Sequence, residues 1–314
     1  MTCNNYQADS AIEVKDLAKY YGELRAVDCI SFEVTKGEFF GFLGPNGAGK
    51  TTTVRILTGI ISPDGGRASV MGYQAGSLEA KQVMGVVPEM ANAYQDLTGW
   101  ENLMLMGELY GLSSSERRNR ASRLLRQLEL FSRKDDLVRT YSKGMRQRLI
   151  LCMALISDPG VLFLDEPTSG LDVQSTRLIR RMLQELNRNG KTIFLTTHDM
   201  DEANDLCHRV AIIEKGRIAA TDAPEKIRLA TSALHSVLVC FDGCVPDEEL
   251  EKLPGVSGLK NHGHKCRLYT DDPGKVVISL VNYCADRDVK IISLNTLAPS
   301  LEDAFVKLTS GELR

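Results

Sequence analysis

Three segments of the chain carry residue types suited to phosphate chemistry, and they follow one another in a fixed order. The four constrained positions of the first segment would match by chance in about one chain of this length in a hundred. That segment alone therefore indicates a phosphate-binding loop and no more, and the other two make the indication specific. In order, the segments are Gly44-Pro45-Asn46-Gly47-Ala48-Gly49-Lys50-Thr51, Ser142-Lys143-Gly144-Met145-Arg146-Gln147-Arg148 and Val161-Leu162-Phe163-Leu164-Asp165-Glu166-Pro167.

The first segment has the composition of a loop that surrounds phosphate groups. Its three glycines allow consecutive backbone N–H groups to face inward, a geometry that side chains would obstruct or that requires a positive φ. A helix beginning near Lys50 adds the positive end of its dipole, and Lys50 can reach the β- and γ-phosphates of a nucleotide. The Thr51 hydroxyl can bind Mg²⁺, and Thr52 can contact a further phosphate oxygen. An ordinary glycine-rich turn is the alternative. The expected binding residues are Gly44, Pro45, Asn46, Gly47, Ala48, Gly49, Lys50, Thr51 and Thr52.

The third segment places two acids directly after an apolar run. Residues 161–164 are apolar enough for a buried central strand, and α/β folds bind ligands at the carboxyl ends of such strands. Asp165 is then the candidate for binding Mg²⁺ through water, and Glu166 the candidate general base that polarises an attacking water. Two acids at a strand end can also be simple turn residues, but the upstream loop favours catalysis.

The elements around these segments alternate between strands and helices. This alternation predicts an α/β fold with a largely parallel core, an antiparallel β edge and a helical subdomain. We expect strands at residues 12–14, 31–34, 39–43, 85–87, 161–164, 192–196 and 210–213, a hairpin at 66–74, and helices at 50–59, 78–84 and within 100–130.

The pattern changes near residues 224–232, after which the chain has the strand and helix periods of a small α+β domain. Strands are expected there at 236–241, 255–259, 265–269 and 289–294, and helices at 247–252, 273–284 and 301–308. The predicted organisation is a polar tail (1–10), a nucleotide-binding domain (11–232) with its helical subdomain at about 90–158, and a C-terminal accessory domain (233–314).

Composition narrows the classes of partner. The 314 residues are 43% hydrophobic and 25% charged, as in ordinary globular proteins, and the net charge of −3 gives no overall attraction to nucleic acid or anionic lipid. No stretch approaches the roughly 18 apolar residues of a membrane span, and the first residues do not have the pattern of a secretory leader. The chain is therefore expected to be cytosolic, with no nucleic acid as partner.

Eight cysteines in such a chain are expected to be reduced thiols, most of them small core residues. Thiolate and imidazole ligands for zinc could come from one cluster, although its spacing matches no compact zinc pattern and suits a hairpin equally well. The members of this cluster are Cys240, Cys244, His262, His264 and Cys266.

Taken together, the three segments resemble the nucleotide-binding subunit of an ABC transporter, over residues from about 11 to 230. The segment that begins at Ser142 resembles the ABC signature loop, whose serine, glycine (here Gly144) and helix N-terminus bind a γ-phosphate. In that family they do so from the opposite subunit, so that two ATP molecules lie in a head-to-tail dimer. Because each motif occurs once, the resemblance implies a homodimer or pairing with a similar chain. A serine N-cap followed by a basic surface helix would give the same local sequence.

Further positions match the family pattern. Tyr21 resembles the aromatic residue that stacks on adenine, although the neighbouring Tyr20 is the alternative. Ser169-Gly170-Leu171-Asp172 resembles the loop that communicates across the dimer, and Asp172 is counted with the nucleotide-binding residues. His198 follows an expected strand and resembles the switch histidine that contacts the γ-phosphate.

Two departures mark a branch of the family. Glu89 stands where many relatives carry a glutamine that contacts Mg²⁺, the attacking water and the membrane partner; a carboxylate could still hold metal or water there. Lys143 and Met145 depart from the commoner Leu-Ser-Gly-Gly-Gln signature. These variants, together with the late Pro299-Ser300-Leu301-Glu302-Asp303-Ala304-Phe305, resemble the drug, sodium and polysaccharide (ABC-2 type) exporters. That late run could also be an amphipathic helix capped by Ser300.

The resemblance implies an ATPase that uses ATP and Mg²⁺ and powers a separate ABC-2-type permease, with export of a drug, ion, lipid or polysaccharide. Catalysis is expected from Glu166, His198 and Lys50, metal binding from Thr51, Asp165 and Glu89, and coupling from residues 89–100 with the helical insert. The chain would then lie at the inner face of the cell membrane, held there by its permease. A soluble ABC ATPase acting on ribosomes or DNA, and a nucleotide-binding regulator without turnover, are the alternatives; the first would need tandem domains or a long coiled coil.

Overall fold

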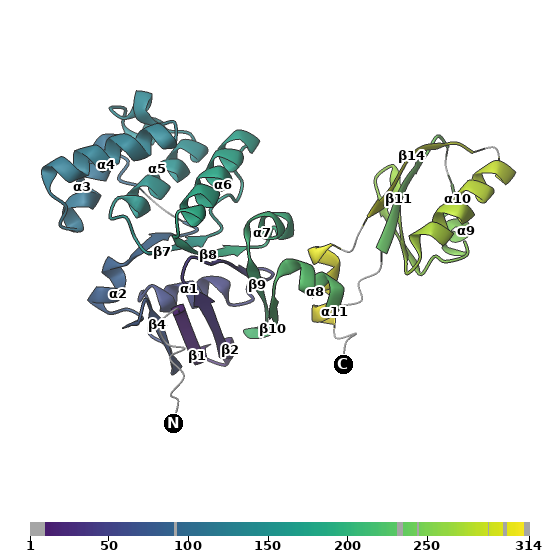
Figure 1. Cartoon of the computed structure of the whole chain (residues 1–314), viewed down its shortest axis with the longest axis horizontal. Helices are drawn as coiled ribbons and strands as arrows, with labels where there is room; N and C mark the ends of the chain where they lie inside the picture. The colour runs from purple at the N-terminus through teal and green to yellow at the C-terminus, as the bar shows by residue number, and fades with distance from the viewer. Residues whose placement is uncertain are drawn as a thin grey trace. The chain divides into compact units, whose positions relative to one another are not determined.

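The computed structural model describes residues 10–90, 93–230, 235–243, 245–287, 289–297 and 300–310. The chain separates into two compact units, Met1–Pro224 and Glu225–Arg314. Figure 1 shows both units. The domain boundary expected between residues 232 and 233 falls among residues 231–234, and the expected tail falls almost entirely among residues 1–9; both stretches lie outside the described residues.

A largely parallel sheet forms the core of the larger unit. Its strands are β3 (Phe39–Leu43), β6 (Met84–Val87), β7 (Val161–Asp165), β8 (Thr192–Thr197), β9 (Arg209–Glu214) and β10 (Arg217–Asp222). They are ordered β10-β9-β3-β8-β7-β6, with every neighbouring pair parallel except β10 with β9. The predicted α/β class is confirmed. The sequence pattern did not predict β10, which follows a tight turn at Lys215 and Gly216, both with positive φ.

An antiparallel sheet forms the β edge that was expected. It consists of β1 (Ser10–Tyr21), β2 (Leu24–Thr35), β4 (Gly65–Val70) and β5 (Tyr73–Gln74), in the order β2-β1-β4-β5. β1 and β2 are longer than the runs predicted at 12–14 and 31–34. Their pairing contains register shifts, and Asp16 and Cys29 have positive φ. These irregularities break the period-2 alternation, so only short pieces of each strand were visible in the sequence.

The two sheets share one hydrophobic core. Phe32 of β2 stacks on Phe40 of β3 with ring centroids 5.7 Å apart. Phe194 of β8 contacts Phe32 and Phe40, and also Phe42 and Phe163. Helix α1 (Lys50–Leu57) contributes to the same core, and the positive φ of Gly59 just beyond it fits the predicted glycine stop.

Helices make up the predicted insert and the outer layer of this unit. They are α2 (Leu78–Gln82), α3 (Gly99–Leu109), α4 (Ser114–Gln127), α5 (Lys143–Leu155), α6 (Val173–Arg188) and α7 (Met200–Leu206), with short 3₁₀ turns at Phe131–Arg133 and Val138–Thr140. Capping boxes begin α3 (Thr98 with Glu101) and α4 (Ser113 with Glu116). In Figure 1, α3, α4 and α5 lie side by side. None of the helices in the described ranges is long and apolar enough to cross a membrane.

The smaller unit has the α+β composition that the sequence predicts. Its elements are α8 (Pro224–Ala230), β11 (His235–Phe241), α9 (Asp247–Glu251), β12 (Gly258–His262), β13 (Lys265–Thr270), α10 (Pro273–Arg287), β14 (Ile291–Leu297) and α11 (Leu301–Ser310), with the sheet order β12-β13-β11-β14. The strand expected at 255–259 begins only at Gly258, because Gly255 turns the chain with φ 93°.

The candidate zinc cluster is spread over this smaller sheet. Val239 pairs with Cys266 across β11 and β13. Cys240 is the next residue along β11, so it and Cys266 point to opposite faces of the sheet. Cys244 and the side chain of His262 lie outside the described residues, and the rest of the cluster forms no group of three metal-ligating side chains.

The aromatic core predicts a large effect of one substitution. Phe194→Ala removes the ring that contacts four other phenylalanines, and we expect a loss of about 3–5 kcal/mol in the free energy of unfolding. Urea unfolding followed by circular dichroism measures it. Tyr73→Ala, at an exposed aromatic of the edge strand β5, is the matched control and should change stability little. Equal losses in the two variants would contradict the assignment of this core.

Candidate functional site

Strand register brings the chemistry-bearing segments to one edge of the parallel sheet. Leu43 of β3 pairs with Thr197 of β8, and Thr196 pairs with Asp165 of β7. The residues that follow these strand ends, Gly44, Glu166 and His198, therefore leave the sheet side by side. This is the edge at which parallel α/β sheets bind ligands.

The glycines of the phosphate loop are needed for two different reasons. Gly47 and Gly49 have positive φ values of 80° and 109°, which orient the loop before α1 begins at Lys50. Gly44 is needed for close packing instead, because a Cβ there would lie 2.3 Å from the carbonyl oxygen of Ile213 on β9. The loop therefore packs closely against the sheet, and its chain continues directly into the N-terminus of α1.

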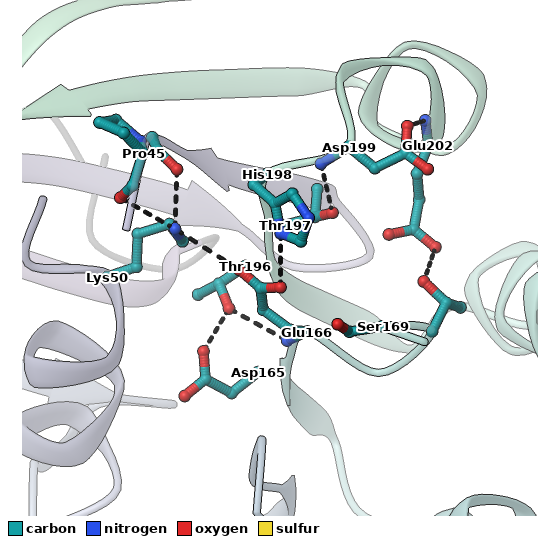
Figure 2. A network of polar contacts seen from close by, with 12 residues as sticks. Pro45, Lys50, Asp165, Glu166, Ser169, Thr196, Thr197, His198, Asp199 and Glu202 are labelled. Atoms are coloured by element: carbon teal, nitrogen blue, oxygen red, sulfur yellow. Dashed lines mark hydrogen bonds and ion pairs between the residues drawn. The ribbon is translucent and has the colours of Figure 1, made fainter. Parts of the chain in front are cut away.

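Lys50 is folded back over this loop. Its Nζ donates hydrogen bonds to the carbonyl oxygens of Gly44 (2.7 Å) and Pro45 (3.2 Å), and lies 3.5 Å from Oε1 of Glu166. Figure 2 shows these contacts. The side chain is only 5% exposed. The Lys50 ammonium is therefore already placed to bind a phosphate oxygen. In this structure the Glu166 carboxylate balances its charge.

Glu166 lies between a cation and an imidazole. Its Oε2 is 2.6 Å from Nδ1 of His198, on the side away from Lys50 (Figure 2). The backbone of Glu166 has φ 51° and its N–H donates to the carbonyl oxygen of Thr196, which turns the chain sharply after β7. His198 is 55% exposed and Glu166 9%, so a partly solvated ring covers a nearly buried carboxylate.

Asp165 is buried at the end of β7, with 2% exposure, and accepts a hydrogen bond from the Thr196 hydroxyl. The Thr196 hydroxyl oxygen Oγ1 also accepts a 3.3 Å hydrogen bond from the Glu166 N–H. Thr196 is not among the site residues expected from the sequence. The available signal was a hydroxyl at the end of an otherwise apolar strand, since a buried hydroxyl needs a partner.

A pocket of about 380 Å³ gathers most of the predicted nucleotide-binding residues. Tyr21 lines this pocket, whereas Tyr20 does not. Leu24 and Ala26 add an apolar wall and were not among the residues expected from the sequence. A larger open hollow of about 950 Å³ lies along β1 and β4 and contains none of the motif residues. The predicted residues in the smaller pocket are Tyr21, Pro45, Asn46, Gly47, Gly49, Lys50, Thr51, Thr52, Glu89 and Glu166.

The signature segment does not line this pocket in its own chain. Ser142 caps α5, accepting a hydrogen bond from the Met145 N–H, and Asp172 caps α6. A Cβ at Gly144 would lie 2.3 Å from Ser175 Oγ, so α5 and α6 begin in close contact. The backbone N–H and the hydroxyl of Ser175 both donate to Asp172 and lower the pKa of its carboxyl.

Lys143, the residue that departs from the common signature, reaches the neighbouring loop. Its Nζ donates a 2.9 Å hydrogen bond to the carbonyl oxygen of Ser169. Gly170 has φ 64°, and a Cβ there would lie 2.5 Å from Lys143 Nζ, so a larger residue would displace the end of the lysine side chain. Ser142, Gly144 and Asp172 thus form a second group, separate from the pocket residues.

The oxygen donors near the pocket suit a hard divalent cation. The Thr51 hydroxyl and the carboxylates of Asp165 and Glu89 are the available ligands, and Mg²⁺ commonly takes one or two carboxylates with water and substrate phosphates. The described residues contain no ready cluster of three His, Cys, Asp or Glu side chains. The three oxygen donors named above fit Mg²⁺.

Several solved structures share this fold. One of them, described as an ATP-binding subunit of an ABC transporter, is 32% identical, covers 70% of this chain and 92% of its own, and has a TM-score of 0.66. A dimeric bacterial ABC transporter cassette is 28% identical and covers 68% of this chain and 98% of its own, with a TM-score of 0.63. A related dimer, 27% identical, holds ADP and Pi in a post-hydrolysis state.

Sequence relatives extend over nearly the whole chain. The Nod factor export ATP-binding protein I of Paraburkholderia xenovorans is 39% identical over 98% of this chain and 99% of its own length. The linearmycin resistance ATP-binding protein LnrL of Bacillus subtilis is 34% identical over 96% of this chain and 99% of its own. The family model for ABC transporters matches residues 27–169. The chain therefore belongs to the ABC transporter family, as an ATPase that hydrolyses ATP for transport.

Proposed function

We propose that this ATPase drives export through a separate permease of the ABC-2 type. The observation that carries the catalytic part is the Glu166 carboxylate, held between Lys50 and His198 at the mouth of the phosphate loop. The export part is supported by relatives that are named for Nod factor export and linearmycin resistance and that cover almost the whole chain. The cargo class is a drug, ion, lipid or polysaccharide.

Each residue of the catalytic site has a distinct role in this proposal. Lys50 and the N-terminus of α1 neutralise the β- and γ-phosphates, which is the main requirement of phosphoryl transfer. Glu166 accepts a proton from the attacking water and His198 orients both Glu166 and the γ-phosphate. Tyr21 stacks on the adenine. Thr51, Asp165 and Glu89 hold Mg²⁺, which supplies charge neutralisation at the phosphates when it is bound.

The second group of residues acts on a partner subunit. Ser142, Gly144 and Asp172 lie outside the pocket of their own chain, and Ser142 stands at the N-terminus of the 13-residue helix α5. A helix N-terminus favours an anion. We assign these residues to the γ-phosphate bound by the opposite subunit, with two ATP molecules between two copies of this chain or a similar one. The dimeric cassettes among the structural relatives support this arrangement.

Exposed apolar side chains lie on the surface expected to meet the permease. Met90, Tyr94 and Leu109, in or beside residues 89–100 and α3, are 87%, 57% and 70% exposed. These side chains are accessible to a protein partner. We assign this surface, with α3 to α5, to the permease, which would hold the chain at the inner face of the membrane. The accessory domain at 233–314 would stabilise or regulate the dimer.

Replacement of Glu166 tests the catalytic assignment. Glu166→Gln turns the carboxylate into an amide that cannot accept a proton, so we expect the rate of phosphate release to fall at least about a hundredfold while binding of a fluorescent ATP analogue persists. Glu185→Gln, at an exposed acid of α6, is the control. Undiminished turnover in the Glu166 variant would contradict the proposed role.

Mixing two inactive variants tests the shared site. Lys50→Ala breaks the phosphate loop and Ser142→Arg blocks the signature segment, and neither should hydrolyse ATP alone. In an equal mixture half the dimers are mixed, and each mixed dimer has one intact site of two, so activity should return to about a quarter of wild type. Phosphate release from the mixture measures this. A mixture as inactive as its parts would exclude a site shared between subunits.

Affinity capture of the tagged full chain from detergent-solubilised cells tests the partner. Mass spectrometry should identify a polytopic membrane protein, and Leu109→Glu should weaken its recovery, because a charge on an apolar contact surface opposes docking. Ile278→Glu, at an exposed apolar residue of the smaller unit, is the matched control and should leave recovery unchanged. Recovery of ribosomal or DNA-repair proteins instead would overturn the transporter assignment.

A further inference from the structure

A fully buried carboxylate lies behind the catalytic edge. Glu202 of α7 is 0% exposed, and its Oε1 accepts hydrogen bonds from the Thr168 hydroxyl (2.8 Å) and from Nε of Arg180 (3.2 Å). Its Oε2 is buried and has no hydrogen-bond partner among the described residues. A charge removed from water in this way requires a partner of opposite sign. Arg180 of α6 is the residue that supplies it.

Arg180 also holds the segment that carries His198. Its Nη2 donates to Oδ2 of Asp199 at 3.0 Å, and Oδ1 of Asp199 accepts from the backbone N–H groups of Asp201 and Glu202. Asp199 therefore caps α7 directly after His198. The Asp199 N–H in turn donates to the Thr197 hydroxyl, as Figure 2 shows. The backbone that follows His198 is therefore held by the Asp199 cap, which is bound to the Arg180 guanidinium.

The same guanidinium fixes the segment that carries Glu166. Thr168, which donates to Glu202, lies two residues after Glu166 in the chain. Arg180 thus reaches the Glu166 segment through Glu202 and Thr168, and the His198 segment through Asp199. These two segments meet at the 2.6 Å contact between Glu166 and His198. A planar guanidinium can bond two carboxylates at once, which a lysine ammonium on one flexible stem does poorly.

We propose that Arg180 is a positioning residue for hydrolysis, which sets the distance between Glu166 and His198 by clamping their two segments through Glu202 and Asp199. This inference rests on the proposed roles of Glu166 and His198. Arg180 does not line the nucleotide pocket. It therefore affects the chemical step and leaves nucleotide binding unaltered, a split that a residue needed only for folding would not produce.

Steady-state kinetics of Arg180→Met test the proposal. Without the guanidinium, Glu202 retains a buried charge with no cation, and both segments shift to relieve it. We expect kcat to fall about tenfold, because small misplacements of catalytic groups are costly, with the KM for ATP unchanged within about twofold. Arg181→Met, the same change at the exposed next residue of α6, should have wild-type kinetics. Wild-type kcat in Arg180→Met would overturn the proposal, as would equal changes in kcat and KM.

A double variant distinguishes positioning from loss of structure. Arg180→Met combined with Glu202→Gln removes the buried charge as well as its partner, so thermal stability should recover over Arg180→Met alone, whereas kcat should stay low because Arg180 no longer joins the two segments. A kcat restored to the wild-type value would overturn the proposal. Arg180→Lys should retain part of the activity. If Arg180→Met does not fold, as judged by its thermal unfolding, Thr168→Val removes one donor and keeps the side-chain shape. That variant should lower kcat at constant KM, and failure to do so would overturn the proposal.

Comparison with Glu166→Gln distinguishes failure of the proposed clamp from failure of the proposed catalytic function. Full turnover in Glu166→Gln would remove the proposed base and, with it, the clamp. An inactive Glu166→Gln together with a wild-type kcat in Arg180→Met and in Thr168→Val would leave the proposed function intact and refute the clamp alone.

Discussion

The parallel register of β3, β8 and β7 is the constraint on which the site depends. Leu43 pairs with Thr197, and Thr196 with Asp165, so the phosphate loop, the histidine and the two acids leave the sheet at one edge. A shift of one residue along β7 would exchange the faces on which Asp165 and Glu166 emerge, because strand side chains alternate. The aromatic core below the edge resists such a shift, since Phe163 and Phe194 are packed against each other at 5.6 Å. Core packing and active-site geometry are thus one constraint.

Charge balance is the second requirement of this edge, because a carboxylate buried without a partner is costly. Asp165 and Glu166 at the end of β7 and Glu202 of α7 each have a partner. Glu166 faces Lys50 and His198, Glu202 faces Arg180, and Asp165 accepts a hydrogen bond from the neutral hydroxyl of Thr196. Lys50 differs from Arg180 in one respect that bears on function. Its position over the phosphate loop allows a bound phosphate to become its counter-charge, whereas both partners of Arg180 are carboxylates of its own chain.

The sequence was sufficient for the fold class and for the phosphate-loop and strand-end residues, because those features depend on local signals: buried strand runs, glycines before a helix, and acids at a strand end. Tyr21 and Glu89, which also line the pocket, were expected only from the resemblance to the family. It was insufficient where the partner is distant in the chain. Nothing near Glu202 indicates that its cation is Arg180, 22 residues away, and nothing near Lys143 indicates Ser169. Positive φ values at residues other than glycine also made several strands hard to predict. Asp16 and Cys29 interrupted the alternation of β1 and β2, and Lys215 concealed the turn before β10. The sequence pattern therefore could not predict the polar contacts between distant residues or the irregularities of the backbone.

The loop from Thr168 to Asp172 connects the Glu202–Arg180 ion pair with the start of α5. On one side Thr168 bonds to Glu202, and on the other the Ser169 carbonyl accepts a hydrogen bond from Lys143 at the start of α5. Asp172 ends the loop by capping α6, the helix that carries Arg180. One short segment thus contacts both Glu202, which is ion-paired with Arg180, and Lys143, which lies between the residues Ser142 and Gly144 that we assign to the nucleotide of the opposite subunit. Because its two ends are held by an ion-paired carboxylate and a helix cap, the loop has little freedom to adjust independently. A displacement of α5 must therefore be transmitted to the Glu166 segment or break a named hydrogen bond.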